Sequence, residues 1–344
     1  MKTILLVGAT GAQGSAVAKY LSATGEYRIL ALTRSATSTS AQELATLPNV
    51  ELAIGSATSG YDIDAFASAA SKSDYVLVNT DGFTLGEQAE TFWGIRLFEL
   101  AVKAGVKHFI YSGLDPASKA SGYDPDYYCG HYEGKARVQE WIHSQEDSPM
   151  SWTIIRSGPY IELLSAVMAP MKQADGTAVF AIPLGDGAVP FIHLGDYGNY
   201  IHWSLSHPEQ SNHLDFGIAT ATVSGNEIAA AFSKHSGKAA QFVDLDIEHW
   251  NAEAWKNLPK GKDTKIGFQY VKDDNALRMT YGENFKNWWN LYKASKGNKG
   301  LIQRDYAFLD RIAPDRVKSL EEWMGKVKYT GDKEEVLRLQ ASTK

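Results

Sequence analysis

Short apolar runs alternate with longer amphipathic stretches through the first half of the chain. The runs are rich in β-forming residues and cover residues 3–7, 27–32, 50–54, 74–79, 106–112 and 153–156. The clearest stretch between them, residues 87–104, repeats apolar side chains at helical spacing, and Gly105 ends it. Strands and helices that alternate in this way predict an α/β fold with a doubly wound parallel sheet.

A glycine-rich turn follows the first apolar run. Gly8, Gly11 and Gly14 come directly after residues 3–7, and a helical pattern starts at Ala16. Glycines in such a turn let the backbone approach a pyrophosphate, while the helix N-terminus offers unpaired N–H groups and a partial positive charge. The last glycine also lets the helix pack closely on the strand. A strand, three glycines and a helix in this order predict a Rossmann-type nucleotide site.

The end of the second run indicates which dinucleotide binds. Sheets of this kind that prefer NAD usually end this strand with Asp or Glu, which binds the ribose 2′-hydroxyl. Thr33, Arg34 and Ser35 stand here instead. A guanidinium can hold a 2′-phosphate with paired hydrogen bonds, and a nearby hydroxyl can add another. The alternative is that Arg34 is a solvated loop residue, and we predict NADP(H) as the cofactor.

Ligands of doubly wound sheets bind at the carboxyl ends of the strands. This rule nominates the residues that follow the apolar runs, which are 8–14, 34, 79–83, 112–114 and 157–161. The nomination depends only on the geometry of parallel sheets.

The pattern changes from about Pro159 onward. Residues 161–171 favour an apolar helix, and the runs 178–183 and 189–193 resemble a hairpin. Several large aromatic residues are crowded into residues 284–292. These side chains either fill the core of a lobe with little regular structure or line an apolar substrate pocket.

The change near Pro159 also indicates two parts of the molecule. We expect residues 1–158 to form an NADP(H)-binding domain, to which residues 190–220 return. Residues 159–189 and 221–344 would form a smaller mixed α/β lobe that covers the carboxyl edge of the sheet and binds the substrate or a partner. A chain of 344 residues is long enough for two joined parts.

Composition narrows the classes of function. The net charge is −6 with no basic block, which does not indicate direct binding of nucleic acid. Cys129 is the single cysteine, so an internal disulfide is excluded and a reducing compartment fits. No stretch has the length of a membrane span, and the N-terminus does not resemble a signal peptide. We expect a cytoplasmic protein without membrane contact, with nuclear entry left open, and no metal site, because the histidines lack ligand spacing.

The segment between the fifth and sixth runs contains the candidate catalytic residues. Short-chain dehydrogenases place a Tyr and a Lys four residues apart where the helix after the fifth strand begins. Lys135 occupies the lysine position, but His131 stands four residues before it. Lys135 can bind the nicotinamide ribose and relay a proton, or it is a solvated helix lysine. His131 can titrate near neutrality and replace the tyrosine, or it starts the helix and bonds to the backbone.

Other phenols lie close to this segment. Tyr127, Tyr128 and Tyr132 could also donate a proton, and the sequence does not rank them.

Together these motifs resemble the NmrA-like family of atypical short-chain dehydrogenases. VGATGAQG at 7–14 is similar to the family's glycine turn, and HYEGK at 131–135 resembles its version of the catalytic segment. YSGLD at 111–115 and RSGPYIE at 156–162 resemble the ends of its fifth and sixth strands. The resemblance covers about residues 1–245, and segments of the tail resemble a subgroup common in filamentous fungi.

The resemblance implies a set of cofactor contacts. The glycine turn and Arg34 would hold NADP(H), and Lys135 with the loops after the fourth and sixth strands would surround its nicotinamide half. The implied cofactor-binding residues are Gly8, Thr10, Gly11, Ala12, Gln13, Gly14, Arg34, Ser35, Asn79, Thr80, Asp81, Gly82, Phe83, Lys135, Pro159, Tyr160 and Glu162. Gly55-Ser-Ala57 stands where many members have Gly-Asp, which removes an adenine contact.

Two kinds of protein belong to the family that the motifs resemble. Some members are NADP(H)-dependent reductases of aromatic or ether-containing metabolites, and they depend on the lysine. Others resemble redox sensors or transcriptional co-regulators that bind the dinucleotide and a protein partner. The aromatic-rich lobe favours a reductase of a small aromatic or polyketide-like substrate, whereas the missing tyrosine favours the non-catalytic regulator. We expect the reductase, as a monomer or a homodimer.

Overall fold

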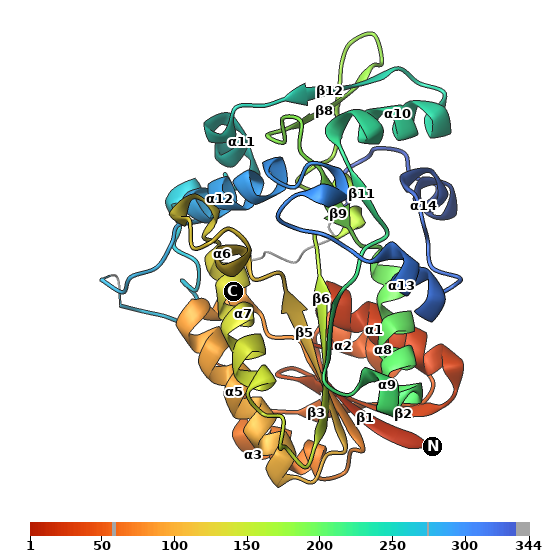
Figure 1. Cartoon of the computed structure of the whole chain (residues 1–344), viewed down its shortest axis with the longest axis vertical. Coiled ribbons are helices and arrows are strands. Elements are labelled where there is room, and N and C mark those ends of the chain that lie inside the picture. The colour runs from red at the N-terminus through yellow and green to blue at the C-terminus, as the bar shows by residue number, and fades with distance from the viewer. Residues whose placement is uncertain (57–59, 274, 335–344) are drawn as a thin grey trace.

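A seven-stranded parallel sheet is the centre of the molecule. The computed structural model describes residues 1–56, 60–273 and 275–334 (Figure 1). The strand order is β10-β6-β5-β4-β1-β2-β3, and all neighbours are parallel. The strands are β1 (Lys2–Val7), β2 (Tyr27–Thr33), β3 (Val50–Ile54), β4 (Tyr75–Val78), β5 (His108–Leu114), β6 (Ser151–Ser157) and β10 (Leu214–Gly217). The order runs outward in both directions from β1 and β4, which confirms the predicted doubly wound sheet.

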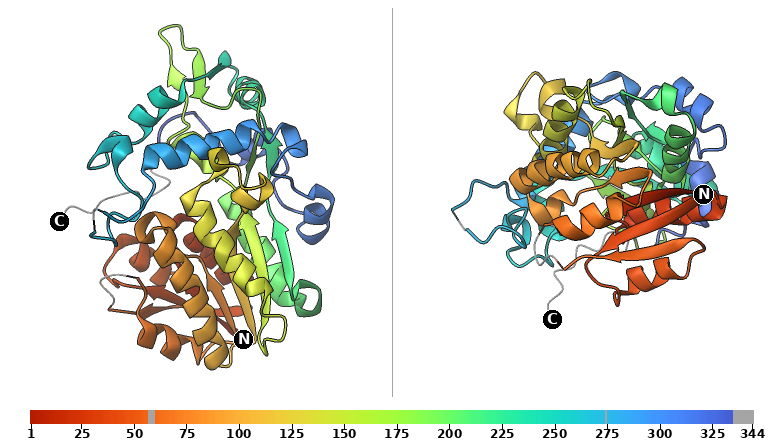
Figure 2. Two further views of the ribbon diagram at one scale, coloured as in Figure 1. Left: turned by 60° about the vertical axis from the view of Figure 1, so that its left-hand side comes forward. Right: turned by 90° about the horizontal axis from the view of Figure 1, so that it is seen from below.

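Helices cover both faces of this sheet (Figure 2). One face carries α1 (Ala12–Thr24), α2 (Thr39–Ala45), α8 (Tyr197–Ser206) and α13 (Tyr306–Ile312). The other face carries α3 (Ile63–Ala70), α5 (Glu87–Lys103) and α7 (Gly130–His143). In β1, Ile4 and Leu6 pack into the first layer, and Leu5 and Val7 pack into the second. Because both faces are buried, this strand is apolar at successive positions rather than at alternate ones.

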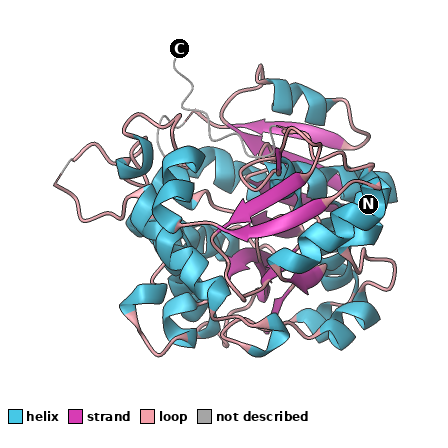
Figure 3. Cartoon of the chain, turned by 90° about the horizontal axis from the view of Figure 1, so that it is seen from above, coloured by secondary structure: helices cyan, strands magenta, loops and turns pink. Residues whose placement is uncertain are grey.

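A smaller mixed lobe lies over the carboxyl ends of the main strands, and helices flank its sheet when it is seen from above (Figure 3). The lobe has a three-stranded sheet, β12-β8-β7, and an antiparallel pair, β9 and β11. Its elements are β7 (Met171–Lys172), β8 (Ala178–Ile182), β9 (Val189–Phe191), β11 (Ala221–Val223), α10 (Gly225–Ser236), β12 (Ala240–Asp244), α11 (Ile247–Ala254), α12 (Tyr281–Lys293) and α14 (Leu320–Val327). Trp288, Trp289 and Tyr292 of α12 are buried in its core, so these aromatic residues stabilise the lobe by packing.

Two predictions for this lobe are wrong. Residues 178–183 and 189–193 do not form a hairpin, because β8 pairs with β7 and β12 while β9 pairs with β11. Residues 161–171 do not form a helix beyond a short 3₁₀ turn at Ile161–Ser165, and β7 follows at Met171. Apolar runs indicate burial, but partners distant in the sequence decide which strands pair.

The chain passes between the two parts more than once. Segment 190–220 contributes β10 to the main sheet and α8 to one of its faces, and α13 returns to that face after α12. Just before α13, Arg304 forms a bidentate ion pair with Asp115 after β5, at 2.6 and 3.0 Å. Both side chains are at most 2% exposed, so the pair fastens the late segment to the main sheet from within.

Three short segments complete the α-helices of the described chain. They are α4 (Gly82–Leu85), α6 (Ala117–Ala120) and α9 (Pro208–Ser211). Within the described residues, no helix combines the length and apolar character needed to cross a bilayer. Residues 335–344, which the sequence assigns to the lobe, lie outside the described residues.

Candidate nucleotide-binding site

The turn between β1 and α1 requires glycine at two positions. Gly8 has a φ of +79°, and a side chain there would collide with the carbonyl oxygen of Asn79. At Gly14 an added Cβ would collide with the carbonyl oxygen of Gly8, because α1 packs directly against the turn. The tight turn therefore keeps the helix N-terminus close to the carboxyl ends of β1 and β4.

The first turn of α1 has N–H groups without partners. Gly11 precedes the helix, offers no side-chain cap and is exposed, and no acidic residue lies in this turn. Ala12, Gln13 and Gly14 present backbone N–H groups that have no acceptor in the described chain. Thr10 is half-buried beside them. With the helix dipole, these groups fit a phosphate.

Arg34 and Ser35 follow β2, the strand next to β1. Arg34 is exposed and forms no ion pair within residues 1–56, 60–273 and 275–334. Ser35 is also exposed, and its hydroxyl lies 3.2 Å from that of Thr37. An available guanidinium beside hydroxyls fits a 2′-phosphate. Ala57, where the adenine contact was expected to be lost, lies outside the described residues.

Lys135 is buried at the carboxyl ends of β4 and β5, with 7% of its surface exposed. Its Nζ donates to the backbone oxygen of Thr80 at 3.0 Å, to the Thr80 hydroxyl at 3.1 Å and to the Ser112 carbonyl at 3.2 Å. The Asn79 Oδ1 acceptor is farther away, at 3.4 Å. The ring centroid of Tyr111 lies 5.5 Å from Nζ. Lys135 is therefore not a solvated helix lysine.

Glu90 pairs with Lys135 and was not identified from the sequence. It lies on α5, its side chain has no exposed surface, and Oε1 is 3.3 Å from Lys135 Nζ. Thr80 Oγ1 donates to the same oxygen at 2.8 Å. Burial raises the pKa of Glu90, and the Lys135 ammonium ion opposes that rise. Its spacing from Trp93 and Leu97 on the apolar face of α5 was the one available signal.

His131 is enclosed in an aromatic cluster at the start of α7. Its Nδ1 lies 2.8 and 3.0 Å from the two amide atoms of Asn284, and its ring centroid is 4.7 Å from that of Phe83. Burial lowers the pKa of His131 to about 4. The expectation that His131 titrates near neutrality is therefore wrong, and the imidazole is neutral at pH 7.

Gln13 connects the glycine turn to two neighbouring strand ends. Its Nε2 donates to Ser112 Oγ at 2.8 Å, and its Oε1 accepts from the Tyr160 hydroxyl at 3.1 Å. The Ser112 hydroxyl is also 3.0 Å from that of Tyr197. Both ends of the Gln13 side chain are thus used inside the protein, and its backbone N–H remains for a ligand.

The phenols near the catalytic segment lie in different surroundings. Tyr132 is 2% exposed and its hydroxyl lies 2.6 Å from that of Tyr292 in the lobe core. Tyr128 bonds to an ion pair on the outer side of α5 and α7, and Tyr127 precedes it in the same outer segment. Tyr160 is the phenol that bonds to the glycine turn.

The residues after β4 form the start of α4 and lie against the Glu90 carboxylate. Asp81 accepts hydrogen bonds from the N–H groups of Phe83 and Thr84 at 3.1 and 3.2 Å, and so caps α4. A Cβ on Gly82 would collide with the Glu90 carboxylate. These contacts place Asp81 and Gly82 within the framework around Lys135.

The residues after β6 contact the lobe. The Pro159 carbonyl accepts from the Ile192 N–H at 3.0 Å. Glu162 Oε1 accepts from His193 Nδ1 at 2.6 Å and from the Leu194 N–H at 3.1 Å. The side chain of Glu162 therefore stabilises the contact between the segment after β6 and the segment after β9.

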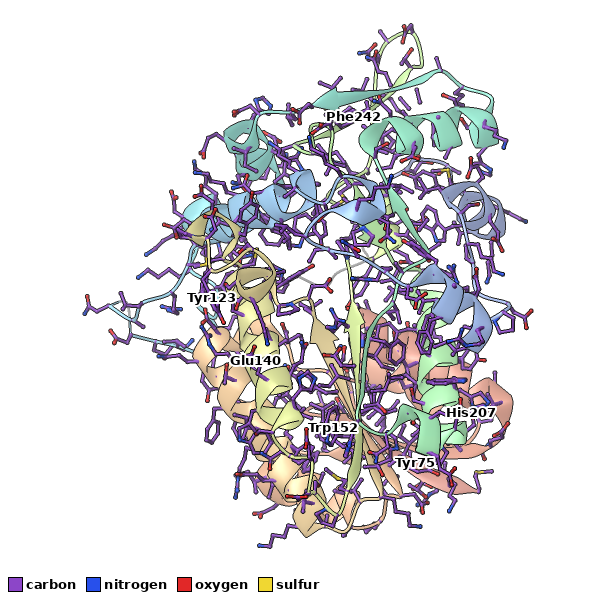
Figure 4. The ribbon with its side chains drawn as sticks, viewed as in Figure 1. Tyr75, Tyr123, Glu140, Trp152, His207 and Phe242 are labelled. Atoms are coloured by element: carbon purple, nitrogen blue, oxygen red, sulfur yellow. The ribbon has the colours of Figure 1, made fainter. Side chains whose placement is uncertain are left out.

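A pocket of about 270 Å³ lies on the outer side of α7. Its lining includes Tyr123 and Glu140, which Figure 4 labels beside α6 and α7, and does not include Lys135. Lys119 pairs with Glu140 there at 3.0 Å. The pocket is separate from the glycine turn and from the buried lysine.

The parallel sheet and its glycine turn define a protein of the Rossmann class. The family model described as "NmrA-like family" matches residues 1–290, and the chain belongs to that family. The resemblance predicted from the motifs is thereby confirmed.

Known relatives and solved structures agree with this assignment. The chain is 27% identical over 292 residues to lnaB of Aspergillus flavus, an NmrA-like family domain-containing oxidoreductase, with 79% of this chain and 84% of lnaB covered. NmrA, a negative transcriptional regulator, has the same fold with a TM-score of 0.69 and 22% identity, over 94% of this chain and 90% of NmrA. The NADPH-dependent quinone oxidoreductase QOR2 of Escherichia coli, solved with NADPH, gives a TM-score of 0.67 and 22% identity, over 95% and 100%.

Proposed function

We propose that the protein is an NADP(H)-dependent oxidoreductase that reduces a small aromatic or polyketide-like molecule. The observation that carries this proposal is the buried ammonium group of Lys135 at the strand ends where a nicotinamide would lie. The names of two similar proteins support the same kind of function, since lnaB is an oxidoreductase and QOR2 is NADPH-dependent.

The residues present fit the cofactor along its length. Arg34 and Ser35 would bind the 2′-phosphate, and the N–H groups of Ala12 to Gly14 would bind the pyrophosphate. Lys135 would bind the nicotinamide ribose. When bound, the reduced cofactor supplies the hydride.

Lys135 would also supply the proton that balances the hydride. Its ammonium group has three N–H bonds, and the contact to Asn79 is the longest of its hydrogen bonds. A ligand hydroxyl can take that place at the smallest cost. His131 is neutral and packed against Phe83, so it would shape the aromatic wall of the site rather than give the proton. The lobe at 159–189 and 221–334 would enclose the substrate.

A titration followed by a turnover assay tests the proposal. The purified protein is titrated with NADPH, NADP⁺, NADH and NAD⁺, and NADPH oxidation is then followed over quinones, aromatic ketones and enones. We expect NADPH to bind at least about tenfold more tightly than NADH, and to be oxidised with a member of the panel. Failure of all four dinucleotides to bind would refute the proposal.

A variant of Lys135 tests its role in the reaction. Lys135→Met removes the ammonium group while keeping most of the side-chain volume, and we expect it to abolish turnover. Lys119→Met, which changes an exposed lysine, is the control and should turn over normally. Undiminished turnover by Lys135→Met would remove this lysine from the mechanism.

A non-catalytic regulator that responds to NADP(H) is the second candidate. The observation that favours it is His131, which stands in place of the tyrosine and is buried and neutral. NmrA, a regulator, shares the fold. Binding that distinguishes NADPH from NADP⁺, with no turnover on the whole panel, would favour the regulator.

A further inference from the structure

A buried carboxylate lies directly behind the lysine of the proposed site. Glu90 Oε1 is 3.3 Å from Lys135 Nζ, and the two side chains are 0% and 8% exposed. The Thr80 hydroxyl donates to Glu90 at 2.8 Å and accepts from Lys135 at 3.1 Å. Glu90, Thr80 and Lys135 thus form one closed set of contacts at the end of β4.

Glu90 is the acidic member of this set, and its contact with the ammonium group favours the ionised carboxylate against the rise in pKa that burial causes. Four further acceptors lie within 3.4 Å of Lys135 Nζ, and all are neutral oxygens of Asn79, Thr80 and Ser112. Among the described residues, Glu90 is the one carboxylate within 4.0 Å of that ammonium group. Neutral oxygens orient an ammonium ion, but a counter-charge is needed to hold it charged in a site of low dielectric.

Two glycines make room for this carboxylate. A Cβ on Gly82 would collide with Glu90 Oε2, and a Cβ on Gly134 would lie 2.8 Å from it. Glu90 Oε2 itself is buried and has no hydrogen-bond partner in the described chain. Since an apolar side chain could fill this space without the cost of a buried charge, filling the core does not explain the glutamate.

We propose that Glu90 is a positioning residue that keeps Lys135 charged and holds its Nζ in one orientation toward the nicotinamide ribose. This inference rests on the proposed function. Glu90 acts through Lys135 and has no exposed surface with which to touch a ligand.

Other titratable groups face the pair from neighbouring elements. Asp81, at the start of α4, adds to the rise that burial causes in the pKa of Glu90. Burial, followed by the charge of Glu90, raises the pKa of Tyr111 on β5 well above its usual range. Burial, and then the charges of Asp81 and Glu90, raise the pKa of Tyr61, which precedes α3. Burial and Lys135 lower the pKa of His131 on α7. Among these groups, Asp81 is therefore the one further carboxyl group that faces the pair.

Glu90→Gln provides the direct test, because it removes the charge and keeps the shape. In protein with labelled lysines, the NH₃⁺ signal that is missing from Lys135→Met identifies Lys135. We expect its slowly exchanging NH₃⁺ signal to be present in the wild-type protein and lost in Glu90→Gln, because the ammonium group loses its carboxylate partner. The same NH₃⁺ signal in both proteins would overturn the proposal.

Glu87→Gln is the matched control. Glu87 lies one turn before Glu90 on α5 and also pairs with α7, through Arg137, but it does not contact Lys135. We expect Glu87→Gln to leave the Lys135 signal unchanged. Loss of the signal, as in Glu90→Gln, would mean that any lost link between the two helices has this effect, and the proposal would fail.

Glu90→Asp keeps the proposal testable if Glu90→Gln does not fold. Its shorter carboxylate keeps the charge but withdraws from Lys135, so we expect the slowly exchanging NH₃⁺ signal of Lys135 to be lost. A retained signal would contradict the positioning role. We also expect about tenfold weaker NADPH binding by Glu90→Gln and normal binding by Glu87→Gln. If no dinucleotide binds the wild-type protein, the proposed function fails, whereas the lysine signals still decide the charge-holding role of Glu90.

Discussion

Arg34 and Lys135 carry the same charge in opposite surroundings. Arg34 is exposed and without an ion pair in the described chain, so its guanidinium is available for a phosphate. Lys135 is enclosed by five oxygens within 3.4 Å, and one of them belongs to the buried Glu90. Arg34 would select NADP(H) over NAD(H), and Lys135 would act at the nicotinamide end of the cofactor.

Arg34→Ala tests the selection of the cofactor. The variant loses the charge-assisted hydrogen bonds to a 2′-phosphate, which are worth on the order of 1.5–3 kcal/mol, so NADPH binding should weaken by tenfold or more. NADH binding should stay nearly unchanged, since NADH has no 2′-phosphate. Arg28→Ala is the control, because Arg28 lies on β2, the strand that Arg34 follows, and is already paired with Glu51. Equal losses for NADPH and NADH would contradict the assignment.

The buried imidazole of His131 makes stability depend on pH. Burial lowers its pKa to about 4 from an unfolded value of 6.5, so the unfolded chain binds more protons between these values. Stability is therefore complete above about pH 6.5 and is lost as the pH falls toward 4. His131→Phe keeps a ring in the cluster and should reduce the loss of unfolding free energy between pH 7.5 and 5.5 by about 1 kcal/mol, measured by urea denaturation.

A matched variant separates this effect from other histidines. His108 is also buried, with its pKa lowered to about 4, and contributes to the pH dependence of both proteins. His207→Phe changes an exposed histidine and should keep the wild-type pH dependence. If His131→Phe had the same pH dependence as the wild-type protein, His131 would not be a buried, neutral group in the folded protein.

Site residues that are identified by their position after a strand or before a helix were predictable from the sequence. Site residues whose role depends on a partner distant in the sequence were not. Gly8, Gly14 and Arg34 stand at positions that strand and helix spacing alone identifies. Glu90 is an ordinary helix glutamate until α7 places Lys135 beside it. The neutrality of His131 likewise depends on its burial, to which the stacked ring of Phe285 contributes from a distant part of the sequence.

At the scale of elements, the pairing of α5 with α7 sets the geometry of the site. A Cβ on Gly94 of α5 would lie 2.5 Å from Val138 Cγ2 on α7, and a Cβ on Gly134 of α7 would lie 3.3 Å from the Glu87 carbonyl on α5. Each helix therefore meets its neighbour at a glycine. This close approach brings the Glu90 carboxylate to Lys135 through the space that a side chain would occupy.

Gly134→Ala tests the close approach of the two helices. The added methyl group would press on Glu90 and on the backbone of α5, and we expect a loss of about 1–3 kcal/mol in unfolding free energy together with weaker NADPH binding. Gly325→Ala in α14 is the control, because nothing lies within 4 Å of its Cβ position. That change should leave binding intact and stabilise the protein by up to about 1 kcal/mol. A neutral result for Gly134→Ala would mean that the helices have room to separate.

Helices and strands, like the site residues, were predictable where a local pattern defines them and not where a distant partner does. The strands of the main sheet were predictable because each is an apolar run buried on both faces and bounded by turns. The pairing of β8 with β12 was not predictable, since three further strands (β9, β10 and β11) and three α-helices (α8, α9 and α10) separate them in the chain. Local pattern identifies an element, and long-range packing chooses its neighbour.

At the scale of the whole molecule, buried charges join the late segment to the main sheet. Arg304 contacts Asp115 through two hydrogen bonds and also donates to the Ile218 carbonyl at 3.0 Å. Arg156 at the end of β6 contacts the same Asp115 oxygen at 3.0 Å. One carboxylate thus connects β5, β6 and the segment before α13, which then packs against the face of the sheet that carries α1.

Arg304→Met should destabilise the protein strongly. Removing one partner leaves Asp115 with the half-buried Arg156 alone, and loss of a buried pair costs about 3–5 kcal/mol. Urea denaturation measures the loss. Arg96→Met breaks an exposed pair with Glu99 and should change the unfolding free energy by less than about 1 kcal/mol. Similar small losses in both variants would show that the buried pair does not fasten the late segment.

The same pair affects how the chain folds as it is made. Asp115 and Arg304 are separated by 189 positions, an interval of about 10–40 s at ordinary rates of translation. Throughout that interval the nascent sheet holds a carboxylate whose fully buried partner has not yet left the ribosome. The carboxyl edge of β5, where the proposed cofactor would lie, therefore closes late, and a nascent chain stalled before residue 304 would have an open and hydrated edge there.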